Sequence, residues 1–295
     1  MASVIVCAPA KVNLYLAVGS KRPDGYHDVL TVMQSLSLAD DVVLCDADDL
    51  ALECAPDPCL SAEDNLAFRA ARRLAAAHGI PARAHITISK RIPAGAGLGG
   101  GSADAAATLV GLAALWALPS DAGLRDVAAS LGADVPFALE GGTELLAGRG
   151  DELVRRLPTP ALDLVLVNPG VPVSTAAAYA AVDASPREQP ASADALIAAL
   201  ESGDASAVAR ALHNDMTASS CGLVPVIHDA LECLRGAEGV LGVEMAGSGS
   251  TVFGICRDGG SATRAAETAR RRGWWATSAT TVANGASIAG RERGA

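Results

Sequence analysis

The chain has 295 residues and a formal net charge of −10 at pH 7, and half of its residues are hydrophobic although only 3% are aromatic. Its length predicts about two domains, with cores built from Ala, Val and Leu. The negative charge argues against nonspecific nucleic-acid binding. No apolar run reaches the ~20 residues of a membrane span, and the start lacks the basic residues of a signal peptide. We therefore expect a cytoplasmic protein without nucleic-acid or membrane partners.

The seven cysteines are scattered along the chain. They form no C-x-x-C pair and no cluster with histidine at the spacing of a zinc site. We therefore expect buried free thiols. The sequence assigns no metal ligands.

The first strands carry an alternating pattern. Val4–Cys7 is apolar, Ala8–Ala10 contains a proline that is expected to interrupt the strand, and Lys11–Val18 alternates over eight residues. Because successive side chains of a strand point to opposite faces, Lys11 and Asn13 are predicted to share one face.

A turn and a run of strands follow. Pro23-Asp24-Gly25 is typical of a tight turn, and Tyr26 and His27 come directly after it. Strands are then expected over residues 28–38, 41–45 and 50–54. Together with the first strands they predict a mixed sheet with hairpins.

The next segment alternates helices with one strand. Ser61–Asp64 resembles a capping box and predicts a helix over Asn65–His78, which ends before a glycine. A strand is expected at 84–89, a long helix over the alanine-rich run 105–118, and a further helix at 121–131.

Between the strand at 84–89 and the alanine-rich helix lies a glycine-rich segment, Lys90–Asp104. Its glycines allow backbone N–H groups to point inward at an anion, and the following helix has a positive dipole end there, with Ser102 as the expected N-cap. A dinucleotide fingerprint is excluded because no second strand with an acidic end follows, and a Walker loop because no Lys-Ser or Lys-Thr follows the last glycine. The segment therefore predicts a phosphate cradle, with any lysine supplied from elsewhere.

Asp134 lies between a glycine and a proline in an apolar neighbourhood. A carboxylate there needs a partner, and it also suits a helix N-cap. Thr143–Ala147 is predicted to form a strand, and the glycines and prolines of 148–160 mark a domain boundary.

Strands and helices are interleaved in the second half, as in a split βαβ sandwich of the ferredoxin type. No repeat is visible, and residues from 283 onward are polar and are expected to form a loose tail. The predicted strands are 162–167, 239–245, 251–256 and 274–280, and the predicted helices are 175–182, 193–200, 205–212, 226–235 and 261–272.

Three of these segments resemble the signature motifs of the GHMP kinases, the superfamily of galactokinase, homoserine, mevalonate and phosphomevalonate kinases. They are Pro9–Leu14, Pro93–Ala103 and the Gly-Ser-Gly-Ser segment Gly247–Ser250. Two further motifs, Pro23–His27 and Leu131–Phe137, resemble the members that phosphorylate a cytidine diphosphate-linked methylerythritol in the non-mevalonate isoprenoid pathway. The resemblance extends from residue 4 to about 282.

The resemblance implies an α+β fold of two domains, with ATP in the cleft between them. Residues 1–158 would form an N-terminal domain similar to domain 2 of ribosomal protein S5, 159–282 a ferredoxin-like C-terminal domain, and 283–295 a flexible tail. The implied reaction transfers the γ-phosphoryl group of ATP to the 2-hydroxyl of the methylerythritol, giving the 2-phosphate and ADP. Mg²⁺ is expected as a cofactor with ligands that the sequence does not place, and the protein is expected to be a monomer or homodimer.

The resemblance also carries over site residues, motif by motif. Lys11 and Asp134 match the catalytic positions. The positions near the substrate are Asn13, Tyr26, His27, Thr175 and Tyr179. The positions near the nucleotide are Asn65, Lys90, Pro93, Ala94, Gly95, Ala96, Gly97, Leu98, Gly99, Gly100, Gly101, Ser102 and Ala103.

Two residues depart from the motifs. An alanine stands at 103 where a hydroxyl is usual, and the acidic Asp104 that follows either favours the helix dipole or reaches Mg²⁺. The alternatives are a GHMP kinase for another small alcohol of the mevalonate or homoserine type, a nucleotide sensor without catalysis, and a dehydrogenase.

Overall fold

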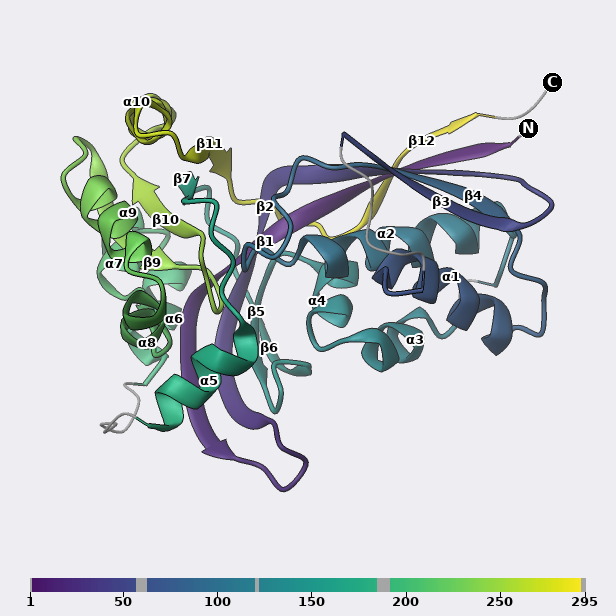
Figure 1. The fold of residues 1–295 in the computed structure, drawn as a ribbon, viewed down its shortest axis with the longest axis horizontal. Coiled ribbons are helices and arrows are strands. Elements are labelled where there is room, and N and C mark those ends of the chain that lie inside the picture. Colours follow the sequence, from purple (N-terminus) through teal and green to yellow (C-terminus); the bar gives the residue numbers. More distant parts are fainter. Residues whose placement is uncertain (1, 57–62, 120–121, 185–191, 293–295) are drawn as a thin grey trace.

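The computed structural model describes residues 2–56, 63–119, 122–184 and 192–292. The chain forms two layered halves that meet along one long strand (Figure 1). One half has a sheet covered by helices α1 to α4 on one face, and the other has a smaller sheet covered by helices on its outer side. No helix in these ranges is long and apolar enough to cross a membrane.

The larger sheet is built on two 19-residue strands, β1 (Ser3–Lys21) and β2 (His27–Cys45), which pair antiparallel. The expected break of the first strand at Ala8–Ala10 is wrong. β1 continues through Pro9, and the register shifts between Pro9 and Lys11. A bulge is a place where a strand accommodates proline, which has no N–H to donate.

The order of the larger sheet is β12-β1-β2-β4-β3, with β5 on β2, β6 on β5 and β8 on β1. β3 and β4 pair in parallel, so the sheet is mixed, as expected. The sequence did not predict β6 or β8. These strands are β3 (Leu50–Ala55), β4 (Ala84–Ser89), β5 (Thr143–Ala147), β6 (Glu152–Leu157), β8 (His213–Asn214) and β12 (Ser287–Glu292).

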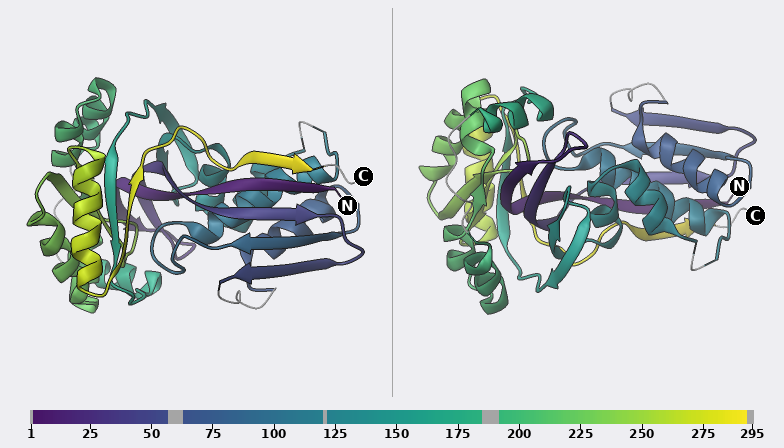
Figure 2. Two further views of the ribbon diagram at one scale, coloured as in Figure 1. Left: turned by 90° about the horizontal axis from the view of Figure 1, so that it is seen from above. Right: turned by 90° about the horizontal axis from the view of Figure 1, so that it is seen from below.

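The prediction of a loose tail from residue 283 is wrong for Ser287–Glu292. These residues form β12, which pairs antiparallel with Ser3–Cys7 of β1, as seen from above in Figure 2. Because the edge of β1 needs hydrogen-bond partners, a polar segment can be ordered by backbone pairing alone. Residues 293–295 lie outside the described ranges.

The helices α1 to α4 cover one face of this sheet. α2 begins at Gly100 with Gly99 as its N-cap, so the prediction of Ser102 as N-cap is wrong. Gly99 adopts φ 70°, a left-handed conformation that glycine reaches without strain, and this starts the helix early. Residues 61, 62 and 121 of the predicted helix starts lie outside the described ranges. The helices are α1 (Leu66–Ala77), α2 (Gly100–Leu115), α3 (Leu124–Leu131) and α4 (Asp134–Glu140).

The smaller sheet has the order β11-β7-β10-β9, and its three pairings are antiparallel. This is the strand order of the split βαβ arrangement, which confirms the ferredoxin-like prediction. The strands are β7 (Asp163–Asn168), β9 (Val240–Met245), β10 (Val252–Cys256) and β11 (Trp275–Thr280). The helices are α5 (Thr175–Asp183), α6 (Asp194–Ser202), α7 (Ala205–Arg210), α8 (Thr217–Leu223), α9 (Val226–Arg235) and α10 (Gly259–Arg271), of which α8 was not predicted.

Alternate side chains of strand β7 pack into two different hydrophobic cores. Leu164 and Leu166 belong to the same buried cluster as Val12 and Leu14 of β1, whereas the intervening Val165 belongs to the cluster that includes α9 and α10. The apolar face of β1 is thus covered by the smaller sheet. Since alternate residues point the opposite way, Lys11 and Asn13 are left to face a cavity.

The prediction that all cysteines are free is wrong for Cys54, which is disulfide-bonded. Cys7, Cys45, Cys221, Cys233 and Cys256 are free.

Candidate active site

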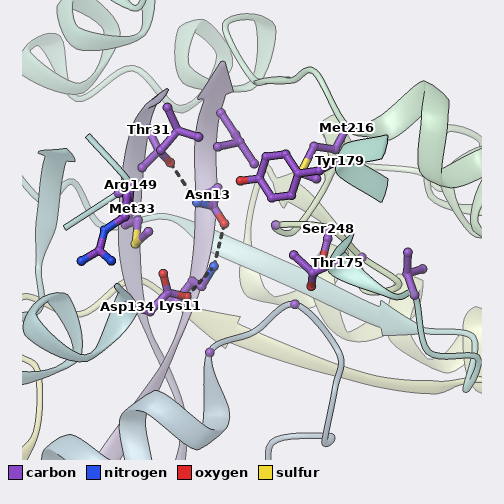
Figure 3. Close-up of a pocket in the computed structure, with 18 of the residues that line it drawn as sticks. Lys11, Asn13, Thr31, Met33, Asp134, Arg149, Thr175, Tyr179, Met216 and Ser248 are labelled. Carbon is purple, nitrogen blue, oxygen red and sulfur yellow. Dashed lines mark hydrogen bonds and ion pairs between the residues drawn. The ribbon is translucent and has the colours of Figure 1, made fainter. Parts of the chain in front are cut away.

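A cavity of about 290 Å³ opens where the two halves meet (Figure 3). Its walls come from β1 and β2, from the glycine loop, here residues 93–99, from α5, and from the Gly-Ser-Gly-Ser loop, here residues 247–250. Residues more than a hundred positions apart therefore line one space.

Lys11, Asn13 and Asp134 meet in this cavity. The Lys11 Nζ donates a hydrogen bond of 2.9 Å to the Asn13 Oδ1 and lies 3.4 Å from the Asp134 Oδ2. The Asn13 Nδ2 donates to the Thr31 Oγ1 at 2.8 Å, and that hydroxyl donates to the Tyr15 carbonyl at 2.7 Å. A chain of hydrogen bonds thus orients the lysine beside the carboxylate.

Asp134 occupies the first turn of α4, and the N-cap is Ala133, so the prediction that Asp134 caps the helix is wrong. Its side chain is 31% exposed, whereas that of Lys11 is 10% exposed. A carboxylate that still reaches solvent is accessible to a bound hydroxyl and can act as its proton acceptor.

The glycine loop packs tightly between β1 and the Gly-Ser-Gly-Ser loop. The Lys11 N–H donates to the Leu98 carbonyl, and the Thr251 N–H donates to the Ala96 carbonyl. A Cβ on Gly99 would lie 2.9 Å from the Lys11 Cγ, and one on Gly97 would lie 2.2 Å from the Ala246 carbonyl oxygen. These glycines are therefore required by the protein's own packing, besides the room that they leave for an anion.

The loop leads directly into the N-terminus of α2. Gly95, Gly97 and Gly99 have φ values of 64°, 78° and 70°. The first N–H groups of a helix have no intrahelical acceptor, and the helix dipole is positive at that end. The arrangement expected for binding phosphates is present.

Two residues predicted to lie near the nucleotide make other contacts. Asn65 caps α1, and its Oδ1 accepts from the Ala67 N–H at 2.8 Å. The Lys90 Nζ lies 2.5 Å from the Asp40 Oδ2 and 2.6 Å from the Asp104 Oδ2. Neither Asn65 nor Lys90 lines the cavity in Figure 3.

The carboxylate of Asp104, whose role the sequence left open, therefore pairs with Lys90. Burial raises the pKa of Asp104 to about 7, even though the adjacent Lys90 ammonium lowers it. Its second oxygen, Oδ1, is buried and accepts no hydrogen bond from the part of the chain that the structure describes. Asp40 in turn accepts the backbone N–H groups of Arg91 and Ile92 through its Oδ1. This group of three charges anchors the entry of the glycine loop to β2 and α2.

The aromatic residues lie farther along the cavity. Tyr179 and Thr175 line it, and the Thr175 Oγ1 lies 3.0 Å from the Ser248 Oγ. The His27 ring stacks on the Tyr179 ring, with centroids 4.8 Å apart, and burial raises the pKa of Tyr179. The His27 Nε2 contacts the Asp183 Oδ1 at 2.9 Å.

Neither Tyr26 nor His27 lines the cavity itself. Tyr26 is 58% exposed, and the guanidinium of Arg149 lies over its ring, 5.4 Å from the centroid. Arg149 does line the cavity, as do Thr31 and Met216. The sequence did not single out these three residues. The alternation of the predicted strand 28–38 could have indicated that Thr31 faces the cavity. No local sequence pattern indicates Arg149 or Met216.

Comparisons with known proteins agree on one superfamily. The family model described as GHMP kinases N terminal domain matches residues 65–142, and the one described as GHMP kinases C terminal matches residues 196–273. The chain is 45% identical over 271 residues to the 4-diphosphocytidyl-2-C-methyl-D-erythritol kinase of Pelotomaculum thermopropionicum, covering 91% of this chain and 94% of that protein. It is 40% identical over 273 residues to the enzyme of that name from Streptomyces avermitilis, covering 90% and 92%.

Solved structures are similar over nearly the whole chain. The crystal structure of a 4-(cytidine 5'-diphospho)-2C-methyl-D-erythritol kinase aligns with a TM-score of 0.80 and 36% identity, covering 94% of this chain and 98% of that one. The homoserine kinase of Cytophaga hutchinsonii aligns with a TM-score of 0.75 and 22% identity, covering 97% of each chain. The second likeness concerns the fold alone.

Proposed function

The chain belongs to the GHMP kinases and, among them, to the 4-diphosphocytidyl-2-C-methyl-D-erythritol kinase family, and on this premise we propose the reaction and the roles of its residues. It transfers the γ-phosphoryl group of ATP to the 2-hydroxyl of 4-diphosphocytidyl-2-C-methyl-D-erythritol and forms the 2-phosphate and ADP. This step belongs to non-mevalonate isoprenoid precursor biosynthesis. The observation that carries the proposal is the Lys11–Asp134 pair, 3.4 Å apart, beside the glycine loop.

Asp134 is the proposed acceptor of the proton from the attacking hydroxyl. As the new bond from oxygen to the γ-phosphorus forms, the bond to the leaving ADP oxygen breaks, and the proton passes to the carboxylate. Phosphoryl transfer has a loose transition state, so most of the catalysis is positioning and charge stabilisation. The Lys11 ammonium, held by Asn13, is placed to stabilise charge on the transferring group.

The triphosphate is proposed to lie along the glycine loop and the N-terminus of α2. Support comes from the positive φ values of Gly95, Gly97 and Gly99, and from the helix start at Gly100. We still propose that Asn65 and Lys90 lie near the nucleotide, where they act indirectly. Asn65 stabilises the start of α1, and Lys90 stabilises the entry of the glycine loop.

Mg²⁺ is proposed to enter with ATP and to neutralise charge on the phosphates when bound. Within the described ranges no three His, Cys, Asp or Glu side chains form a group that could hold a metal ion. Mg²⁺ does not require such a group, because proteins commonly hold it through one or two carboxylates and the phosphates of the substrate. Among the residues that line the cavity, Asp134 is the carboxylate available.

The cytosine is proposed to stack on the aromatic group formed by Tyr179, His27 and Tyr26. Stacking of a base on an aromatic ring contributes about 1–3 kcal/mol in nucleic-acid binding. Tyr179 faces the cavity, His27 supports it from behind, and Arg149 links the cavity to Tyr26. Thr175 is proposed to contact the cytidine side as well.

An assay of the purified protein with ATP, Mg²⁺ and the cytidine diphosphate substrate tests this proposal. Phosphorus NMR should show a new phosphomonoester on the sugar alcohol and an equal amount of ADP. Mevalonate and homoserine serve as control alcohols, since the solved homoserine kinase shares the fold. Faster turnover of either alcohol would contradict the proposed substrate, and ATP binding without any product would indicate a sensor.

The proposal places the protein in the cytoplasm, where ATP is available, as a monomer or homodimer. Cell fractionation and sedimentation analysis would test these two statements.

A further inference from the structure

We propose that Asn214 is a positioning residue that holds the Gly-Ser-Gly-Ser loop at the correct distance from the strand that carries Lys11. This inference rests on the function proposed above. Asn214 lies in β8, a two-residue strand that neither the sequence motifs nor the expected catalytic residues include.

Both donors of the Asn214 amide are used, and its oxygen accepts one hydrogen bond. Its Nδ2 donates to the carbonyl of Met245 and to the carbonyl of Gly247, both at 2.8 Å, and its Oδ1 accepts from the Met216 N–H at 2.9 Å. The residue is 6% exposed. Two donors and one acceptor in one small planar group are supplied by an asparagine side chain and not by an aspartate or leucine of similar size.

The backbone around Asn214 is tied to β1. Asn214 pairs in parallel with Leu16, and the Asp215 N–H donates to the Leu16 carbonyl at 2.9 Å. The Val18 N–H donates to the Asp215 Oδ2 at 2.8 Å. One side of Asn214 thus follows β1, and its side chain holds the loop.

The loop held by Asn214 contacts the reacting groups. A Cβ on Gly247 would lie 3.3 Å from the Gly97 carbonyl oxygen, 3.5 Å from the Lys11 Nζ and 3.6 Å from the Asn13 Oδ1. Gly247 therefore lies against the glycine loop and the Lys11–Asn13 pair at the same time. A shift of the loop would open the contact between the two loops and change the surroundings of the lysine.

Asn214→Asp keeps the size of the side chain and removes both donors. At neutral pH the introduced carboxylate faces two carbonyl oxygens, which repel it. We expect kcat to fall about 100-fold, since a displacement of ~1 Å in an active site has an effect of this size, while the KM values for both substrates change by less than about threefold.

Acidification supplies a readout that general destabilisation would not produce. The protonated form of the introduced carboxyl group can donate one of the two lost hydrogen bonds. The ratio of variant to wild-type kcat should therefore rise as the pH falls. Dividing by the wild-type kcat cancels the pH dependence that the two proteins have in common. A ratio that stays constant or decreases as the pH is lowered would overturn the proposal.

Gln34→Glu is the matched control. The Gln34 side chain is buried in β2, where its Nε2 donates to the Ser35 and Val282 carbonyls and its Oε1 accepts from the Thr143 Oγ1. We expect its kcat to stay within about threefold of wild type, because its amide does not hold the Met245 or Gly247 carbonyls. Hydrogen exchange of the peptide covering 245–251 should be faster in the Asn214 variant than in the control.

If Asn214→Asp is not recovered folded, Asn214→Ser, which retains one donor and does not titrate, is measured instead by kcat, by the KM values and by hydrogen exchange of residues 245–251, against the same control. A folded Asn214 variant with wild-type kcat and wild-type exchange would overturn the inference alone. Absence of product from the wild-type protein would instead overturn the proposed function.

Discussion

The two ends of the cavity are built differently. At the end lined by the glycine loop, the Lys11 side chain is 10% exposed, and backbone hydrogen bonds fix the loop on two sides. At the aromatic end, Tyr26 is 58% exposed between β1 and β2, and the wall is formed by Tyr179 of α5, which stacks on His27 of β2. The proposed phosphoryl transfer thus takes place beside backbone that is held by hydrogen bonds, whereas the proposed recognition of the base depends on side chains that differ widely in exposure.

The largest expected effect is at the end lined by the glycine loop. Asp134→Asn should lower kcat about 10²–10⁴-fold, because the amide cannot accept the hydroxyl proton, while the fold is retained. The matched control is Asp126→Asn, which changes an exposed acid in the first turn of α3 and should leave kcat unchanged. Initial rates of ADP formation measure both. Turnover close to wild type in Asp134→Asn would remove the role of Asp134 as base.

Gly97→Ala should have the next largest effect. The added methyl group would lie 2.2 Å from the Ala246 carbonyl oxygen at φ 78°, so the two loops must separate. We expect kcat to fall about 100-fold. Gly79→Ala provides the control, because Gly79 has φ 63° with no atom near the added methyl group.

Gly79→Ala should therefore only introduce the strain of a left-handed residue. We expect its unfolding free energy to fall by about 1–2 kcal/mol and its kcat to stay normal. Urea unfolding and steady-state kinetics of the two variants separate strain from loop displacement. Equal kcat values for the two variants would show that contact between the loops does not matter for turnover.

A smaller effect is expected at the aromatic end. Tyr179→Leu removes a stacking surface and should raise the KM for the cytidine substrate about tenfold, with little change in kcat or in the KM for ATP. Tyr179→Phe keeps the ring and should resemble wild type. If the leucine variant instead lost kcat and kept its KM, the division of the cavity into a chemical end and a recognition end would be wrong.

The smallest effect concerns the charges beneath the glycine loop and appears in stability. Burial raises the pKa of Asp104 from 3.8 to about 7, so between these pH values the folded protein holds a proton that the unfolded chain has released. The unfolding free energy contributed by this group therefore falls as pH rises through that window.

Asp104→Asn removes this dependence, so its stability relative to wild type should increase from pH 5 to pH 8. Urea unfolding at several pH values measures the difference. A variant that loses stability relative to wild type as the pH rises would contradict the raised pKa of Asp104.

Much of the fold follows from local pattern. The sequence placed the strand Thr143–Ala147 at its observed bounds, and the interleaving of strands and helices in the second half indicated the split βαβ arrangement that the smaller sheet adopts. The prediction failed for β6, β8 and β12, which are short or polar. β8 and β12 are ordered by pairing with the distant strand β1, and the exposed β6 by pairing with its neighbour β5. A pairing of backbones leaves no periodic mark on the paired sequence.

The sequence by itself determined the parts of the site whose geometry is local. Glycines allow positive φ in the loop before α2, and the period of a strand puts Lys11 beside Asn13. Only the tertiary structure decided which distant groups meet them. Asp134 comes within reach of Lys11, and Asn214 holds the Gly-Ser-Gly-Ser loop, because β1 packs at once against α4, β8 and the smaller sheet. Short-range pattern describes how one segment can fold, whereas contacts across a hundred or more residues depend on how the folded segments fill shared space.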